Sequence, residues 1–438
     1  MTQETRKTAG PGASLGLLAA TALVMGNMIG SGVFLLPASL APFGWNGVLG
    51  WIVTISGALI LAYVLSRLTR ACPQAGGPAG FVTDAFGPTV GFFISWIYLI
   101  SIWTSVVAIA VAAISYLSEL FPLLGKGEHI PAIAAMALLW LMALINLRGT
   151  RTAGGFQVVT LALKVIPLFV VIVIAVMVLN DGRVQIAPPS PGSISFGSVN
   201  GAASLTLWAL LGFESASVAA ARVRNPQVNI ARATLWGTGL TGLLYLIVCS
   251  AIALLLPEAV VSHSAAPFAT FVGRFWSTDA ATLITVFAVI SCVGALNGWT
   301  LLEAEMVRDM AHRRLLPAWF AETDARGVSR RALLISTVIA SLFAAMNASR
   351  SMQSLFEYLL LLSTSATLWL YLACALSALK LGIARPAALL GAAYALWTLW
   401  GAGIGASGLS FVLMALGLPI WLLVRRRSAE QRVQPGLD

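Results

Sequence analysis

The chain has 438 residues, of which 59% are hydrophobic and only 10% are charged, and its mean hydropathy is +0.90. These values exclude an ordinary soluble domain and indicate an integral membrane protein. The formal net charge of +10 at pH 7 would also fit a nucleic-acid-binding protein, but the placement of the basic residues offers another explanation.

Apolar stretches long enough to cross about 30 Å of hydrocarbon, roughly 20 residues each, recur along the chain. Helices are the expected element, because a transmembrane barrel would alternate apolar and polar residues, whereas these runs are apolar on every face. We predict an all-α integral membrane protein with about twelve transmembrane helices. The spans lie near 14–41, 46–66, 88–118, 130–147, 155–180, 198–221, 233–256, 281–305, 332–347, 353–379, 386–402 and 407–424.

The first span carries the unusual sequence MGNMIGSGVFLLPASL. Gly26, Gly30 and Gly32 each weaken a helix, and Asn27 and Ser31 are polar groups placed where water is absent. Helix packing alone would account for Gly26 and Gly30 as a small-xxx-small pair. The fuller pattern predicts that the helix is interrupted here.

The sixth span, SLTLWALLGFESASVAA, has a matching feature. Gly212, Phe213 and Glu214 lie near mid-span, five spans after the first interruption, and an odd offset reverses the helix direction. This pattern predicts an inverted repeat of five helices, with a binding site between the two breaks, because irregular backbone at this depth must line a cavity. The predicted regions are a tail at 1–12, repeats at 13–180 and 181–380, two further spans at 381–425 and a tail at 426–438.

The basic residues follow the predicted spans. If the N-terminus is cytoplasmic, 21 of the 26 Lys and Arg residues fall in the tails and cytoplasmic loops. The opposite side has Lys126, Arg183, Arg274 and Arg350, and Lys164 lies inside a span. This bias predicts a multi-pass protein of the plasma membrane, the bacterial inner membrane, with both termini cytoplasmic. The lipid bilayer is therefore an expected partner, and nucleic acid is not.

No residue pattern supports catalysis or a resident metal. His129, His263 and His312 fall in predicted loops, without an HExxH pattern or paired carboxylates nearby. The four cysteines are single and widely separated, which fits neither a disulfide framework nor CxxC metal spacing. We expect no enzyme activity, no catalytic residue, no metal and no cofactor.

Several segments together resemble one known family. They are GNMIGSGVFLLPASLA in span 1, GGPAGFVTDAFGP after span 2, TLWALLGFESASVAA with the following NP in span 6, and GWTLLEAE in span 8. Over nearly its whole length the chain resembles the amino acid–polyamine–organocation transporters, and among them the bacterial arginine/agmatine antiporters and related antiporters of basic amino acids and polyamines. The resemblance implies the five-plus-five, LeuT-like fold with broken helices 1 and 6.

The resemblance also implies where a substrate binds. Free N–H groups at the second half of helix 1 would bind an α-carboxylate, and carbonyls freed in helix 6 would accept from an α-ammonium. Tryptophan faces would cover an aliphatic stem or attract a cation. The expected substrate-binding residues are Asn27, Ile29, Gly30, Ser31, Gly32, Trp208, Ala209, Leu211, Gly212, Trp299 and Ser363.

Tyr98, Glu214 and Tyr371 match the gating group of the arginine/agmatine antiporters. For Glu214 we rank a structural and gating role, in which it holds helix 6 in its broken shape, above proton coupling. Ser105 and Val106 form the expected substrate-selectivity wall. Val106 stands where those antiporters have an asparagine, which puts arginine specificity in doubt.

Lys164 is a second departure from that pattern, since the aligned residue in the arginine/agmatine antiporters is small and apolar. A lysine within a span is costly to bury. Related transporters have a lysine that takes the place of a sodium ion and contacts helix 1, and we expect the same coupling role for Lys164. The alternative is a lysine that snorkels or lines a wet crevice.

Four acidic residues lie near the ends of spans. We expect Glu303, Glu305 and Asp309, near Arg308, to form a solvated or ion-paired face at the cytoplasmic end of span 8. Glu357 lies near the predicted extracellular entrance of span 10.

We predict a secondary-active amino acid transporter that works by alternating access, as a sodium-independent exchanger or a proton-linked permease. Val106 and the charge of Lys164 favour a neutral amino acid as substrate. Glu214 and the two tryptophans favour the alternative, a cationic amino acid/polyamine antiporter of the arginine/agmatine type. A permease-like amino acid receptor is a third reading, which would need a signalling domain or partner subunits. The expected ligand is a small amino acid or amine, and a homodimer stays open because family members can be dimers.

Overall fold

The computed structural model describes residues 16–433 except 74, 76, 128, 149, 191, 216–222, 325–326 and 347, with the backbone alone at 150–162 and 426–433. These residues form helices and connecting segments and no strand. The helices are α1 (Leu17–Met28), α2 (Ser31–Leu40), α3 (Trp45–Ala71), α4 (Pro78–Phe86), α5 (Pro88–Leu120), α6 (Ile130–Asn146), α7 (Thr150–Asn180), α8 (Phe196–Leu210), α10 (Pro226–Leu255), α11 (Glu258–Val261), α12 (Pro267–Phe275), α13 (Thr278–His312), α14 (Arg330–Met346), α15 (Met352–Lys380), α16 (Arg385–Gly401), α17 (Gly403–Ala415) and α18 (Leu418–Val433).

Each predicted span overlaps one of these helices or a pair of them. By length and apolar composition, seven described helices are able to cross a membrane, or eight when α1 and α2 count as one bent span. Four other predicted spans coincide with α6, α8, α14 and α16, which have only 15 to 17 residues. The all-helical membrane fold is thus present, while twelve crossings stay a prediction.

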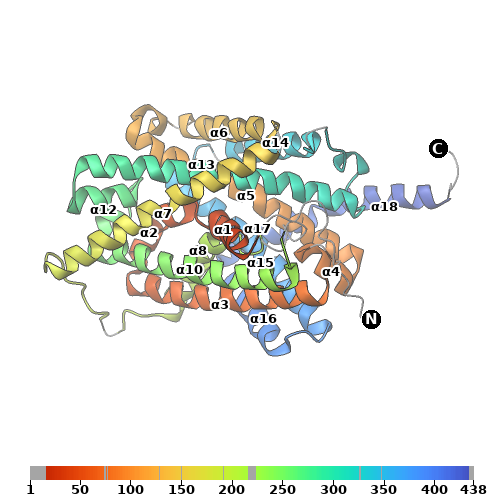
Figure 1. The fold of residues 1–438 in the computed structure, drawn as a ribbon, viewed down its shortest axis with the longest axis horizontal. Coiled ribbons are helices and arrows are strands. Elements are labelled where there is room, and N and C mark those ends of the chain that lie inside the picture. The colour runs from red at the N-terminus through yellow and green to blue at the C-terminus, as the bar shows by residue number, and fades with distance from the viewer. Residues whose placement is uncertain are drawn as a thin grey trace, which may run out of the picture.

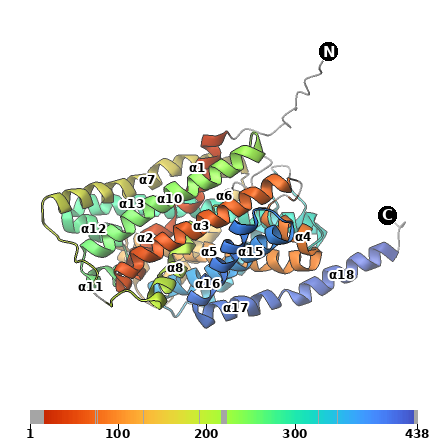
Figure 2. The ribbon, with the colours of Figure 1, turned by 90° about the horizontal axis from the view of Figure 1, so that it is seen from below.

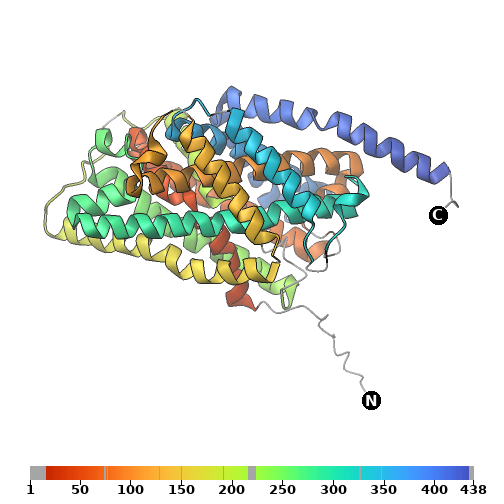
Figure 3. The same ribbon diagram turned by 90° about the horizontal axis from the view of Figure 1, so that it is seen from above.

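The bundle has an inner and an outer set of helices. α5 and α15 are buried along most of their length, whereas the stretch of α17 and α18 that could span a membrane is largely exposed. α3, α10 and α13 run along the long axis of the molecule (Figure 1). α1 packs mainly against α10, and α8 packs mainly against α3. α18 projects from one end of the bundle (Figures 2 and 3). The core around α1, α2 and α8 is therefore enclosed by long helices.

The predicted regions are only partly described. The tail at 1–12 and the last residues, 434–438, lie outside the described residues. The predicted C-terminal tail from residue 426 continues α18 without a break as far as Val433.

Candidate functional site

The first span is broken where the glycines predicted an interruption. α1 ends at Met28 and α2 begins at Ser31, and the two axes differ by 43°. Ile29 and Gly30 connect them in non-helical conformations. The first N–H groups of α2 lack an intrahelical acceptor, as in any helix, and carry the positive end of the helix dipole. No side chain among the described residues caps them.

The last turn of α1 ends in carbonyl groups that a helix leaves free. Three side chains from three other helices cap them in succession. Lys164 Nζ of α7 donates to Gly26 O at 2.7 Å, Trp299 Nε1 of α13 to Asn27 O at 3.2 Å, and Tyr245 Oη of α10 to Met28 O at 2.8 Å. The expected contact of Lys164 with helix 1 is present, and its role in place of a sodium ion stays a prediction. α2 is bonded to α5 through Tyr116 Oη, which donates to Phe34 O at 2.9 Å, and to α10 through Cys249 Sγ, which donates to Val33 O at 3.7 Å.

The second break follows α8. The helix ends at Leu210, and Gly212 has φ +108°, a conformation that favours glycine. Asn27 Nδ2 donates to Ser215 Oγ at 2.8 Å and so ties the two breaks together. Of the predicted sixth span, residues 216–221 lie outside the described residues.

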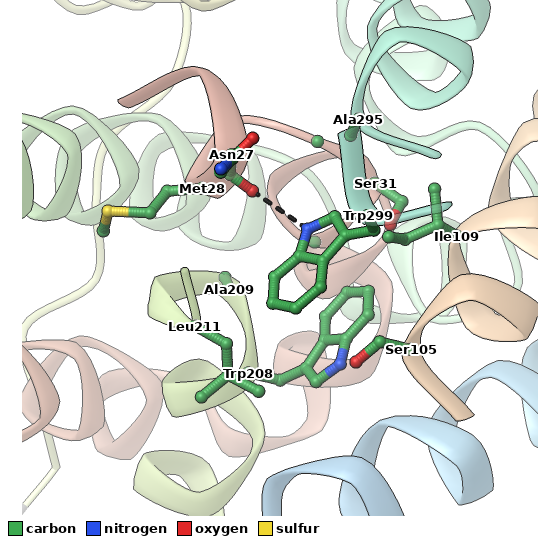
Figure 4. A pocket seen from close by; sticks show the side chains of 12 residues that line it. Asn27, Met28, Ser31, Ser105, Ile109, Trp208, Ala209, Leu211, Ala295 and Trp299 are labelled. Carbon is green, nitrogen blue, oxygen red and sulfur yellow. Dashed lines mark hydrogen bonds between the residues drawn. The ribbon is translucent and has the colours of Figure 1, made fainter. Parts of the chain in front are cut away.

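A small cavity of about 20 Å³ lies between the two breaks, α5 and α13 (Figure 4). Nine of the residues that line it were predicted as binding or wall residues: Asn27, Gly30, Ser31, Gly32, Ser105, Trp208, Ala209, Leu211 and Trp299. The other three, Met28, Ile109 and Ala295, were not predicted. They are apolar residues within spans, and no sequence signal distinguishes them from residues that face lipid.

Four predicted residues do not line this cavity. Ser363 lies one layer behind, where its Oγ is 2.6 Å from Ser105 Oγ and donates to Ser101 O at 3.0 Å. Val106, Ile29 and Gly212 are outside the set of lining residues, and the side chains of Val106 and Ile29 are buried.

The polar groups of the cavity are few. The Ser31 hydroxyl is buried and has no hydrogen-bond partner among the described residues. In Figure 4 the indole of Trp299 points towards Asn27, and a dashed line marks their hydrogen bond. A cavity of this size holds about one water molecule. A larger ligand therefore requires the indoles or the two breaks to move apart.

The walls of the cavity approach closely at Gly32. A Cβ atom there would lie 2.9 Å from the Ala209 Cβ and 3.2 Å from the Trp208 ring. Trp208 in turn packs edge to face against Phe356, with ring centroids 5.3 Å apart. Phe356 also lines a second cavity of about 210 Å³ near the start of α15, so these two rings separate the two cavities.

The predicted gating group lies together in the core. Tyr98 Oη donates to Glu214 Oε1 at 2.7 Å, and Tyr371 Oη donates to Glu214 Oε2 at 2.8 Å. The backbone N–H of Gly212 also donates to Oε2, at 3.1 Å. The Glu214 side chain is fully buried and does not line the cavity. This carboxylate is bonded to the backbone of the break and to two neighbouring helices.

The acidic face expected on α13 is only partly present. Asp309 pairs with Arg313 at 2.7 Å. The prediction is wrong for Glu303, whose side chain is 1% exposed and whose Oε2 has no partner. Glu303 is buried because it lies on the side of α13 that packs inside the bundle, which helix spacing alone does not reveal. Glu357 is partly buried and lies 3.4 Å from the Gln353 amide. Within the described residues, no group of three or more His, Cys, Asp or Glu could hold a metal ion.

The chain is similar in sequence to several known proteins. A family model described as amino acid permease matches residues 15–431. The cadaverine/lysine antiporter of Escherichia coli K12 is 32% identical over 325 residues, which are 74% of this chain and 72% of that protein. The putrescine transporter PotE of Haemophilus influenzae is 29% identical over 79% of each chain. PotE of Escherichia coli K12 is 27% identical over 430 residues, 94% of this chain and 96% of that one.

Proposed function

The chain belongs to the amino acid permease family, whose members are membrane transporters and not enzymes, and from that premise we propose that it exchanges cationic amino acids and polyamines. We propose further that it works by alternating access around the cavity between the two helix breaks. The similarity to a protein named as a cadaverine/lysine antiporter and to transporters named for putrescine supports this substrate class.

The observation that carries the proposal is that Ser31 and two indoles line one small cavity. The unpartnered Ser31 hydroxyl and the free N–H groups of α2 suit a carboxylate, and the hydroxyl also accepts from an ammonium group. Trp208 and Trp299 offer aromatic faces to an aliphatic chain or a cation. A cationic amino acid and the amine formed by its decarboxylation share that chain and that cation, so one site suits both.

A neutral amino acid, the preferred substrate in the sequence-based prediction, has less support. That preference depended on Val106 and Lys164, and neither residue lines the cavity. The Lys164 amine, which comes from α7, donates to the Gly26 carbonyl of α1. Glu214 does not line the cavity either, so the tryptophans and the relatives support the cationic substrate.

The remaining features of the proposal follow the predicted topology. We propose twelve crossings, an inverted repeat of residues 13–180 and 181–380, and a bacterial inner-membrane location with both termini cytoplasmic. We also propose sodium-independent exchange, in which the buried Lys164 amine stands where a sodium ion would bind. A homodimer stays an open alternative.

Exchange in proteoliposomes tests the function. Purified protein is reconstituted in vesicles that contain unlabelled lysine, and uptake of labelled cadaverine is measured with and without sodium. We expect uptake that requires internal lysine and is unchanged when sodium is removed. Empty vesicles and vesicles loaded with leucine are the controls. Exchange of leucine, with no response to lysine, cadaverine or putrescine, would restore the neutral substrate.

A further inference from the structure

Glu303 is a buried carboxylate that the site described above does not use. Its side chain is 1% exposed, and its Oε2 has no hydrogen-bond partner. In the described part of the chain it forms no ion pair, unlike Asp309, which pairs with Arg313. Burying a carboxylate without a partner is costly, and an apolar side chain would fill the same space at lower cost. Packing therefore does not explain Glu303.

The position of Glu303 follows from helix spacing. Trp299, Glu303 and Val307 are four residues apart and so follow one another along one strip of α13. Trp299 lines the central cavity together with Ser105 of α5. Val307 lines a third, apolar cavity of about 330 Å³ together with Trp103 of α5. Glu303 lies between these two cavities, one turn beyond Trp299 towards the C-terminal end of α13.

α5, which packs against α13, also holds a buried polar atom without a partner. The Trp103 indole nitrogen is buried and unbonded among the described residues. Trp103 lines the same apolar cavity as Val307, whereas Ser105, two residues further on and on the opposite side of α5, lines the central cavity with Trp299. Two buried polar side chains with unpaired atoms, Glu303 and Trp103, thus lie on one pair of packed helices, where packing has not satisfied them.

On the basis of the antiport function proposed above, we propose that Glu303 is a specificity-determining residue for substrate charge. Its carboxylate binds the distal ammonium group of a diamine or of a lysine-like amino acid. Binding takes place on the side of Trp299 that faces the C-terminal end of α13, when the site is open to that side.

The chemistry of an ammonium ion fits this position. The face of an indole attracts a cation, and a carboxylate forms strong charge-assisted hydrogen bonds with an ammonium group. Glu303 lies about 6 Å along the helix axis from Trp299, given a rise of 1.5 Å per residue. A cation that leaves the Trp299 ring in this direction therefore meets a carboxylate within one turn. A neutral side chain gains nothing there, so Glu303 favours substrates with a second positive charge.

The test measures substrate affinity at each membrane face. Cadaverine exchange is assayed in proteoliposomes of known orientation, for the wild type, Glu303→Gln and the matched control Glu305→Gln on the same helix. We expect Glu303→Gln to raise the KM for cadaverine by about tenfold or more at the face to which the C-terminal end of α13 points. The KM at the other face should change by less than about twofold, as should both values for Glu305→Gln.

Pentylamine, which has the same carbon chain and one charge, provides a second readout. At the membrane face to which the C-terminal end of α13 points, wild-type protein should prefer cadaverine to pentylamine. Glu303→Gln should lose that preference, and Glu303→Asp should retain part of it.

Three results for Glu303→Gln would each overturn the inference. They are an unchanged KM for cadaverine, an equal rise in KM at both faces, and a lost response to a pH gradient without a change in KM. If Glu303→Gln does not fold, equal affinity of the wild type for the two amines would overturn it too. A wild type that exchanges no diamine refutes the proposed function and this inference together, whereas normal exchange with an unaffected Glu303→Gln refutes this inference alone.

Discussion

Lys164 shows how one buried side chain connects the site to the rest of the bundle. Its amine is fully buried and donates to the carbonyl of Gly26, one residue before Asn27 lines the cavity. A hydrogen bond to a charged group contributes about 1.5–3 kcal/mol, and the Gly26 carbonyl at the end of α1 accepts such a bond from Lys164. The amine therefore stabilises the end of α1 from outside the cavity.

We expect Lys164→Ala to lower the exchange rate by about tenfold or more, because the Gly26 carbonyl at the end of α1 loses its charged donor. The measurement is initial uptake in proteoliposomes, with thermal unfolding of the same preparation. Lys126→Ala changes an exposed lysine in a connecting segment and serves as the control. Unchanged exchange in Lys164→Ala would exclude a coupling role, and a rate restored by added sodium would directly support the sodium-site interpretation.

Prediction from sequence was most informative for residues beside the breaks. Glycines within a span indicated the first interruption, and the family resemblance implied Ser31 and Trp208 as binding residues. Gly30, Ser31 and Trp208 all line the cavity, while their contact with a substrate stays a prediction. Ile109 and Ala295 line it too, but an apolar residue within a span has no local signal of what it faces. Glu303 was misjudged for a related reason, since its burial depends on how α13 is rotated against α5.

At the level of elements, the end of α8 depends on Glu214. A helix that stops inside a protein leaves polar backbone groups that need partners. Glu214 accepts from the Gly212 N–H and from two tyrosine hydroxyls, on α5 and α15. One carboxylate thus fixes the break to two long helices, which supports the structural and gating role over proton coupling.

We expect Glu214→Gln to destabilise the protein by about 1.5–3 kcal/mol for each charge-assisted hydrogen bond that it weakens, because an amide has one acceptor oxygen for three donors. Thermal unfolding in detergent measures this change. Tyr371→Phe removes one of the donors and should lower the melting temperature less, and Tyr63→Phe, at a partly exposed tyrosine, should leave it unchanged. A melting temperature for Glu214→Gln equal to that of the wild type would contradict this account of the break.

The breaks were predictable because they result from local chemistry, whereas other elements were not. The short helices α11 and α12 fall between predicted spans seven and eight and were not predicted. Pro267 at the start of α12 is a recognisable signal for a helix N-terminus, but a helix of nine residues is too short for a search for membrane spans. Their places depend on contacts with the long helices.

At the level of the whole molecule, the distribution of basic residues predicts the orientation. Lys126 and Arg183 are exposed in segments assigned to the outside, and Arg70 and Arg385 are exposed in segments assigned to the cytoplasm. Of the native cysteines, three are buried and Cys72 is partly exposed. Introduced cysteines are therefore able to report the orientation once Cys72 is replaced.

We expect cysteines introduced as Lys126→Cys and Arg183→Cys to react with a membrane-impermeant thiol reagent in intact cells, because both positions face the periplasmic side in the proposed topology. Arg70→Cys and Arg385→Cys should react only after the membrane is permeabilised. Labelling is measured on protein purified from the treated cells, with a Cys72→Ser background as the control. The opposite pattern would place both termini outside.

The two halves of the broken span have largely different bonding partners. α1 is bonded to α7, α10 and α13, whereas α2 is bonded to α5 through Tyr116 and to α10 through Cys249. Ile29 and Gly30 form the non-helical link between these two halves. A change in the backbone angles of this link would alter the separation of the α1 carbonyls from the α2 N–H groups. The two ends of a bound substrate would thus be held by different half-helices, and a substrate of the right length would set the angle between them.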